Sequence, residues 1–166
     1  MSDITMPVYS VSRHRMGIDG SGVTTLVASY GCPLSCKYCI NPEAWDEETI
    51  PKCKRMNPKQ LFDIVKVDHL YFLATGGGVT FGGGESLLHA EFLKEFRAVC
   101  GEEWNLTAET SLNVSKEALE TAIHAVNDFI VDIKDMNPDI YKTYTGRENE
   151  IVKENLQKLA TLVDQN

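Results

Sequence analysis

The 166-residue chain lacks the features that mark several common protein classes. It has no run of about 18 apolar residues, so we expect no transmembrane helix and no membrane partner. Its N-terminus has no apolar segment of the secretory type, which favours the cytoplasm. Its net charge of −8 argues against a dedicated nucleic-acid binder, because such proteins usually carry a basic patch.

The sequence also lacks the groups of side chains that catalyse acid–base reactions. The sequence shows no Ser/His/Asp arrangement and no paired carboxylates of the kind used for general acid–base catalysis. No internal repeat or low-complexity segment stands out. The length and the 43% apolar content are those of one domain with a normal core, which we expect to span residues 1–166.

What the chain does have is a cysteine triplet. Cys32, Cys36 and Cys39 stand in a C-x3-C-x2-C spacing on one short segment. Three thiolates on one loop can ligate three corners of a four-iron cluster, whereas a closed cluster normally takes four protein cysteines. The fourth iron would then be open to a substrate or cofactor.

Two other interpretations of the triplet remain open. A zinc site needs four ligands, usually from two spaced pairs, but no second pair follows, and neither His14 nor His69 sits at a ligand spacing. Plain reduced thiols are the better account of Cys53 and Cys100, which lie far from the triplet. We favour a cluster over zinc and over plain thiols.

Short β-like runs alternate with helical periodicity, which predicts an α/β fold with a parallel sheet. Helices are expected to begin at Asn57-Pro58 and after Ser115, to carry Phe92 and Phe96, and to run from Val152 to Val163. About four βα units result. The four expected strands are Val23 to Ala28, Gly78 to Phe81, Leu106 to Thr110 and Phe129 to Ile133.

Each expected strand is followed by residues suited to chemistry. The cysteines follow the first strand, residues 82–85 the second, Glu109 and Thr110 end the third, and residues 132–134 end the fourth. In β/α folds, ligands gather at the carboxyl ends of the strands. The order of the elements therefore predicts that these groups meet at one site.

Four ordered segments resemble the radical S-adenosylmethionine (radical SAM) superfamily. They are Asp-Gly-Ser-Gly-Val at 19–23, the cysteine loop with Tyr38 before its last cysteine, the Gly-rich run at 76–85, and Phe-Ile-Val-Asp-Ile-Lys at 129–134. Within the superfamily they are most similar to activating enzymes of glycyl-radical enzymes, of the pyruvate formate-lyase type. The resemblance implies a partial (β/α) barrel. Such barrels usually have six units, so four units suggest a short member, a truncated chain, or a sheet completed by a partner.

The resemblance also implies cofactors and their ligands. A 4Fe-4S cluster would be held by the three cysteines of the triplet. A monovalent cation would be held by Glu109, Thr110 and a part-buried Asp132. Contacts to S-adenosylmethionine would come from Tyr38, Asn41, Gly83, Gly84, Glu85 and Lys134.

The activity implied is that of an oxidoreductase with no catalytic residue beyond the cluster and the cofactor. A flavodoxin or ferredoxin would supply an electron, and reductive cleavage of S-adenosylmethionine would give a 5′-deoxyadenosyl radical. That radical would install a glycyl radical in a partner enzyme such as pyruvate formate-lyase. An activating subunit of anaerobic ribonucleotide reductase and a non-catalytic iron–sulfur module are the alternatives.

Overall fold

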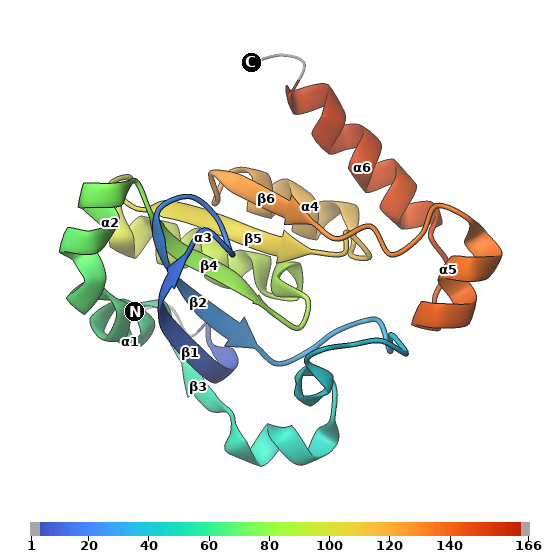
Figure 1. Cartoon of the computed structure of the whole chain (residues 1–166), viewed down its shortest axis with the longest axis horizontal. Helices are drawn as coiled ribbons and strands as arrows, with labels where there is room; N and C mark the ends of the chain where they lie inside the picture. Colours follow the sequence, from blue (N-terminus) through green and yellow to red (C-terminus); the bar gives the residue numbers. More distant parts are fainter. Residues whose placement is uncertain (1–3, 164–166) are drawn as a thin grey trace.

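A computed structural model describes residues 4–163 of the chain, in which one six-stranded sheet forms the centre (Figure 1). The strand order is β3-β1-β2-β4-β5-β6. Strands β2, β4, β5 and β6 are parallel, whereas β1 pairs antiparallel with both β2 and β3. The strand bounds are β1 Met6–Met16, β2 Val23–Ser29, β3 Lys54–Met56, β4 Gly78–Gly83, β5 Asn105–Thr110 and β6 Asp128–Val131.

Helices connect the parallel strands, so the four expected βα units are present. Asn57 caps the first helix with a reciprocal bond to Gln60, and Ser115 caps the fourth through the amide of Ala118. A 3₁₀ turn at Lys66–Asp68 splits the first expected helix in two. The helix bounds are α1 Pro58–Val65, α2 His69–Thr75, α3 Ala90–Cys100, α4 Lys116–Ile123, α5 Pro138–Thr145 and α6 Glu150–Val163.

Three elements were not expected from the sequence: strands β1 and β3 and helix α5. The sheet is therefore parallel only in its main part. Strand β6 also ends at Val131, two residues earlier than expected. Asp132 lies in the following loop with its side chain 64% exposed, so the expectation that it is part-buried was wrong.

The core lies between the sheet and helices α1, α3 and α4. Val79, Phe81 and Leu106 turn one face of the sheet toward Phe92 and Phe96, and all five are at most 1% exposed. The Phe81 and Phe96 rings meet edge to face with centroids 5.4 Å apart. Burying each such side chain contributes about 1.5–3 kcal/mol, so this layer holds the strand ends in place.

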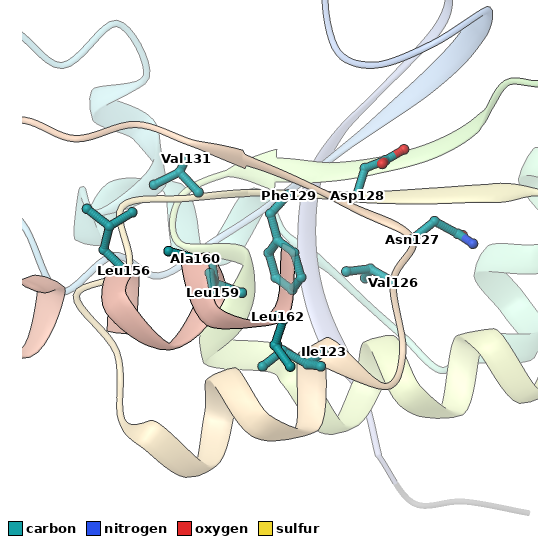
Figure 2. Close-up of a pocket in the computed structure, with 10 residues that line it drawn as sticks. All are labelled: Ile123, Val126, Asn127, Asp128, Phe129, Val131, Leu156, Leu159, Ala160 and Leu162. Carbon is teal, nitrogen blue, oxygen red and sulfur yellow. The ribbon is translucent and has the colours of Figure 1, made fainter. Parts of the chain in front are cut away.

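Within the described residues, the sheet is open at β6, the last strand in the order. Figure 2 shows an apolar groove between β6, α4 and α6 beside this strand. Phe129 and Val131 face Leu156 and Leu159 across it. Among residues 4–163, none of the helices combines the length and the apolar character needed to cross a membrane.

Candidate cluster and cofactor site

A pocket opens at the carboxyl ends of the parallel strands. It encloses about 560 Å³ and lies between the cysteine loop, the turn after β4, the end of β5 and the loop after β6. The structure brings all twelve site residues named from the sequence to its lining. They are Cys32, Cys36, Tyr38, Cys39, Asn41, Gly83, Gly84, Glu85, Glu109, Thr110, Asp132 and Lys134.

The cysteine loop follows β2 directly. Cys36 is buried, Cys32 and Cys39 are half-buried, and all three are free thiols. Burial raises the pKa of Cys32 to about 11. Within the described chain, no three His, Cys, Asp or Glu side chains converge on a point that could hold one metal ion. Cysteines that bind different irons of one cluster need not converge in that way.

The histidines considered for zinc are engaged elsewhere in the fold. The Nε2 atom of His14 lies 3.0 Å from the carboxylate of Asp68. The Nδ1 atom of His69 accepts a hydrogen bond of 2.9 Å from Trp104. Neither residue lines the pocket that contains the cysteines.

Helix α5 supports the cysteine loop from outside the pocket. The backbone amide of Ser35 donates to the Thr145 carbonyl at 3.0 Å, and that of Lys37 donates to the Tyr144 carbonyl at 2.9 Å. The last carbonyls of a helix have no partner within the helix, so they are free to accept these bonds. The Nε atom of Arg147 also donates to the Pro33 carbonyl at 2.9 Å. The end of α5 thus fixes the path of the loop that carries the triplet.

The glycines at 82–84 allow close packing of the turn after β4. A Cβ at Gly84 would lie 2.2 Å from the Gly31 carbonyl oxygen, and one at Gly83 would lie 2.7 Å from the Tyr9 hydroxyl. Gly83 also has a φ of +89°, a conformation that favours glycine. The amides of Gly84 and Glu85 donate to the carbonyls of Ser29 and Gly31. The Gly82 carbonyl accepts from the Ser29 hydroxyl at 3.4 Å, so the carbonyls of Gly83 and Gly84 are the candidate ligand contacts.

Glu85 joins this turn to the end of β5. Its carboxylate accepts bonds from the Ser111 amide at 2.8 Å, the Ser111 hydroxyl at 2.7 Å and the Leu87 amide at 3.2 Å. Burial nevertheless raises the pKa of this carboxyl group above its usual range. Glu85 is 1% exposed, and its hydrogen bonds connect the turn after β4 to the segment after β5.

Lys134 brings positive charge to the pocket from the loop after β6. Its side chain is 18% exposed and pairs with Asp132. Burial lowers the pKa of Lys134, but the hydrogen bond and charge of Asp132 outweigh burial, so the pKa is raised and the side chain is an ammonium. The ammonium lies 5.8 Å from the ring centroid of Tyr38, which is 49% exposed at the mouth rather than inside the loop core.

Glu109 and Thr110 end β5 beside Asp132. The Glu109 carboxylate is half-buried, and no side-chain hydrogen bond to it is found within residues 4–163; burial raises its pKa. The Thr110 hydroxyl accepts from the Leu112 amide at 2.9 Å, so it helps to form the turn after the strand. A cation at these three residues stays a prediction.

Six further residues line the pocket without having been named as ligands. Ser111 stands out because it holds Glu85, and its place directly after β5 was the available signal. The others are apolar, and nothing in a local pattern marks them. The six are Leu34, Ile40, Trp45, Ser111, Ile130 and Val131.

Comparison with known proteins identifies this class of site. Residues 26–164 match the model of the Radical SAM superfamily, and the chain belongs to that superfamily. Its members use a 4Fe-4S cluster and S-adenosylmethionine. The residues present fit these groups, because three thiols share one loop, and a half-buried ammonium and the glycine turn share its pocket.

Two relatives lie within the glycyl-radical activating group. The pyruvate formate-lyase-activating enzyme of Clostridium pasteurianum is 34% identical over 139 residues, covering 78% of this chain and 53% of the relative. The 4-hydroxyphenylacetate decarboxylase activating enzyme of Clostridioides difficile is 32% identical over 212 residues, covering 92% and 66%. The chain thus spans about half to two thirds of the length of these relatives.

One solved structure shows the same fold. QueE from Escherichia coli superposes with a TM-score of 0.53 at 16% sequence identity, covering 75% of this chain and 70% of that one. The α/β architecture and the partial barrel expected from the sequence agree with this likeness.

Proposed function

We propose that the chain, as one radical SAM domain over residues 1–166, is an activating enzyme that installs a glycyl radical in a partner enzyme. When bound, the cluster and S-adenosylmethionine supply one-electron cleavage of the sulfonium and so a 5′-deoxyadenosyl radical. The observation that carries the proposal is the meeting of the cysteine triplet, the turn at 83–85 and Lys134 in one pocket.

Different residues of the pocket would bind the cluster and the cofactor. Cys32, Cys36 and Cys39 would hold three irons of the cluster. Lys134 would offer its ammonium to the carboxylate of the cofactor. The carbonyls of Gly83 and Gly84, on a turn braced by Glu85, would accept from its amino group.

Five further residues of the pocket are assigned other contacts. Tyr38 and Asn41 would flank the cofactor at the mouth of the pocket, where both side chains lie. Glu109 and Asp132 would face a monovalent cation, with Thr110 as a third ligand.

The proposed partner is a glycyl-radical enzyme of the pyruvate formate-lyase type. The decarboxylase-type alignment runs over 212 positions, more than the 166 residues of this chain, so that relative carries inserted residues. The alignments to pyruvate formate-lyase-activating enzymes from Clostridium and Listeria span 139 and 157 positions and do not exceed the chain. A flavodoxin or ferredoxin is the proposed reductant, and the cytoplasm is the proposed compartment, since all five cysteines are free thiols.

The test is an anaerobic reconstitution with iron and sulfide, followed by reduction and addition of S-adenosylmethionine. We expect a four-iron absorbance and release of 5′-deoxyadenosine. A cluster without deoxyadenosine would favour the non-catalytic module. Candidate partners are then added: a glycyl radical in pyruvate formate-lyase supports the proposal, whereas one only in anaerobic ribonucleotide reductase favours that alternative.

A further inference from the structure

Gly82, the penultimate residue of β4, has no role in the proposed function. A Cβ built at this glycine would overlap the Oε2 atom of Glu109. It would also lie 3.0 Å from the Glu109 Cδ atom and 3.2 Å from the Leu26 Cδ1 atom. The carboxyl group of Glu109 therefore occupies the space in which any other residue at position 82 would place its side chain.

The neighbouring glycines are required for a different reason. A Cβ at Gly84 would meet backbone atoms, and Gly83 has a positive φ, so both are needed by the chain itself. Gly82 has no positive φ, and the atoms nearest to its added Cβ all belong to side chains that can shift. The fold tolerates a larger residue at 82, but only if the Glu109 carboxylate moves.

The Glu109 carboxylate has no protein partner that would hold it elsewhere. Glu109 is half-buried at the end of β5 and lines the pocket. No side-chain hydrogen bond or ion pair to its carboxylate is found in the part of the chain that the structure describes. Lys134, which brings positive charge to the same pocket, pairs with Asp132 instead. The carboxylate thus lies against β4 because Gly82 leaves the space free.

A ligand that fills the pocket changes the surroundings of this carboxylate. In the open pocket, solvent can stabilise the charge of Glu109. A ligand displaces that solvent, and a desolvated carboxylate without a partner opposes binding. S-adenosylmethionine carries positive charge on its sulfonium and its amino group, and a metal cation bound with it would carry the same sign. Binding is therefore strong when one of these positive charges meets Glu109.

We propose that Gly82 is a positioning residue for Glu109: its missing side chain places the carboxylate against β4, where it contacts a positive charge of the loaded pocket. The two residues form a volume-matched pair, because one carbon more at position 82 requires one carbon less at position 109. This inference rests on the cofactor of the proposed function, but not on the identity of the glycyl-radical partner.

The test is a double-mutant cycle of Gly82→Ala and Glu109→Asp on the anaerobically reconstituted protein. Affinity for S-adenosylmethionine is measured by equilibrium dialysis. We expect Gly82→Ala to weaken binding about tenfold when Glu109 is present, because the added Cβ displaces the carboxylate. In the Glu109→Asp background the same alanine should have no further effect, since the shorter side chain does not reach position 82.

The source of the positive charge is found by repeating the dialysis in potassium chloride and in choline chloride. Weaker binding in choline would assign the contact to a bound metal cation, and equal binding in both salts would assign it to the cofactor itself. Glu109→Gln keeps the shape of the side chain and removes its charge. It should weaken binding at least as much as Gly82→Ala does.

Thermal unfolding of the iron-free proteins separates positioning from damage to the fold. Gly82→Ala should unfold close to the wild-type temperature, because only side-chain ends have to shift. Gly101→Ala is the control for binding and should keep wild-type affinity, since nothing lies within 4 Å of its added Cβ.

Three results would overturn the inference: full affinity in Gly82→Ala, full affinity in Glu109→Gln, or an equal loss from alanine at 82 with Glu109 and with Asp at 109. The last result would show that the added Cβ damages the turn and does not act through the carboxylate. A wild-type protein that assembles no cluster, or binds no S-adenosylmethionine, would instead overturn the proposed function.

Discussion

At the amino-terminal half of the parallel strands, the fully buried carboxylate of Asp68 has a partner on every side. Arg13 Nε donates to it at 2.8 Å, Thr25 Oγ1 donates at 3.1 Å, and His14 Nε2 lies at 3.0 Å. The side-chain hydrogen bond from Arg13 holds the pKa of Asp68 below its usual range. Charge buried here is fully compensated.

The carboxyl end of the same strands is different. Within the described residues, the Glu109 carboxylate and the Tyr9 hydroxyl have no side-chain partner, and burial raises the pKa of both Glu109 and Glu85. The polar groups at the amino-terminal half of the strands stabilise the fold, whereas those at the carboxyl end are available to a ligand. The predictions below test this division, from the largest expected effect to the smallest.

Cys36→Ala should abolish cluster assembly and 5′-deoxyadenosine formation together, because it removes one of three thiolates. The loss should reach the detection limit in absorbance and product assays. The fold should remain, since Cys36 lines the pocket at the margin of the core and the change removes only its sulfur atom. Cys100→Ala is the control and should assemble a cluster normally. Retained cleavage in Cys36→Ala would contradict the ligand assignment.

Asp68→Asn should lower the free energy of unfolding by about 2–3 kcal/mol, because it leaves Arg13 without its buried partner. The pKa of Asp68 is lowered in the folded chain, so its stabilisation is present above the unfolded value of about 4 and lost as pH falls through the folded value. The gap between wild type and variant should therefore shrink in acid. Denaturant unfolding at several pH values measures this, and cluster assembly at neutral pH should be unchanged. A gap that is constant with pH would contradict the ion pair.

Gly84→Ala should weaken S-adenosylmethionine binding and destabilise the fold by about 1–3 kcal/mol. Its Cβ would meet the Gly31 carbonyl oxygen at 2.2 Å, which pushes the turn away from the cysteine loop. Equilibrium dialysis and thermal unfolding measure the two effects. Gly101→Ala is the control for binding, because nothing lies within 4 Å of its added Cβ. Full cofactor affinity in Gly84→Ala would show that the turn does not contact it.

Lys134→Met should reduce S-adenosylmethionine affinity about tenfold, equivalent to about 1.4 kcal/mol, by removing the ammonium while keeping the length of the side chain. The free energy of unfolding should change by about 0.5 kcal/mol or less, because Asp132 is mostly exposed. Lys142→Met removes a more exposed ammonium on α5 and serves as the control. Equal affinity in all three proteins would remove Lys134 from the cofactor site.

Much of this architecture could be predicted from local patterns. The four parallel strands lie within two residues of their expected ends, because short apolar runs bounded by glycine or polar residues mark them. The site followed from the strand ends, since residues that follow parallel strands meet at one edge. The class of cofactor followed from the spacing of Cys32, Cys36 and Cys39.

The rest escaped local patterns for physical reasons. Strand β1 carries a bulge at Tyr9, which breaks the alternation of a regular strand, and β3 is only Lys54–Met56. Helix α5 could have been found, because Asn137 and Pro138 repeat the Asn-Pro start that marked α1. The approach of Tyr9 to Gly83 depends on sheet order, which no single segment encodes.

Because the end of α5 supports the cysteine loop, the cluster site can form only after α5 has been synthesised. Ser35 and Thr145, which meet at the end of α5, are 110 residues apart in the chain. A ribosome adding about 5–20 residues per second needs roughly 5–20 s to make that stretch. During this interval the three thiols leave the ribosome on a loop without its support. Iron delivered to the nascent chain would therefore meet an unformed site, and correct loading belongs to the time after residue 147 has emerged.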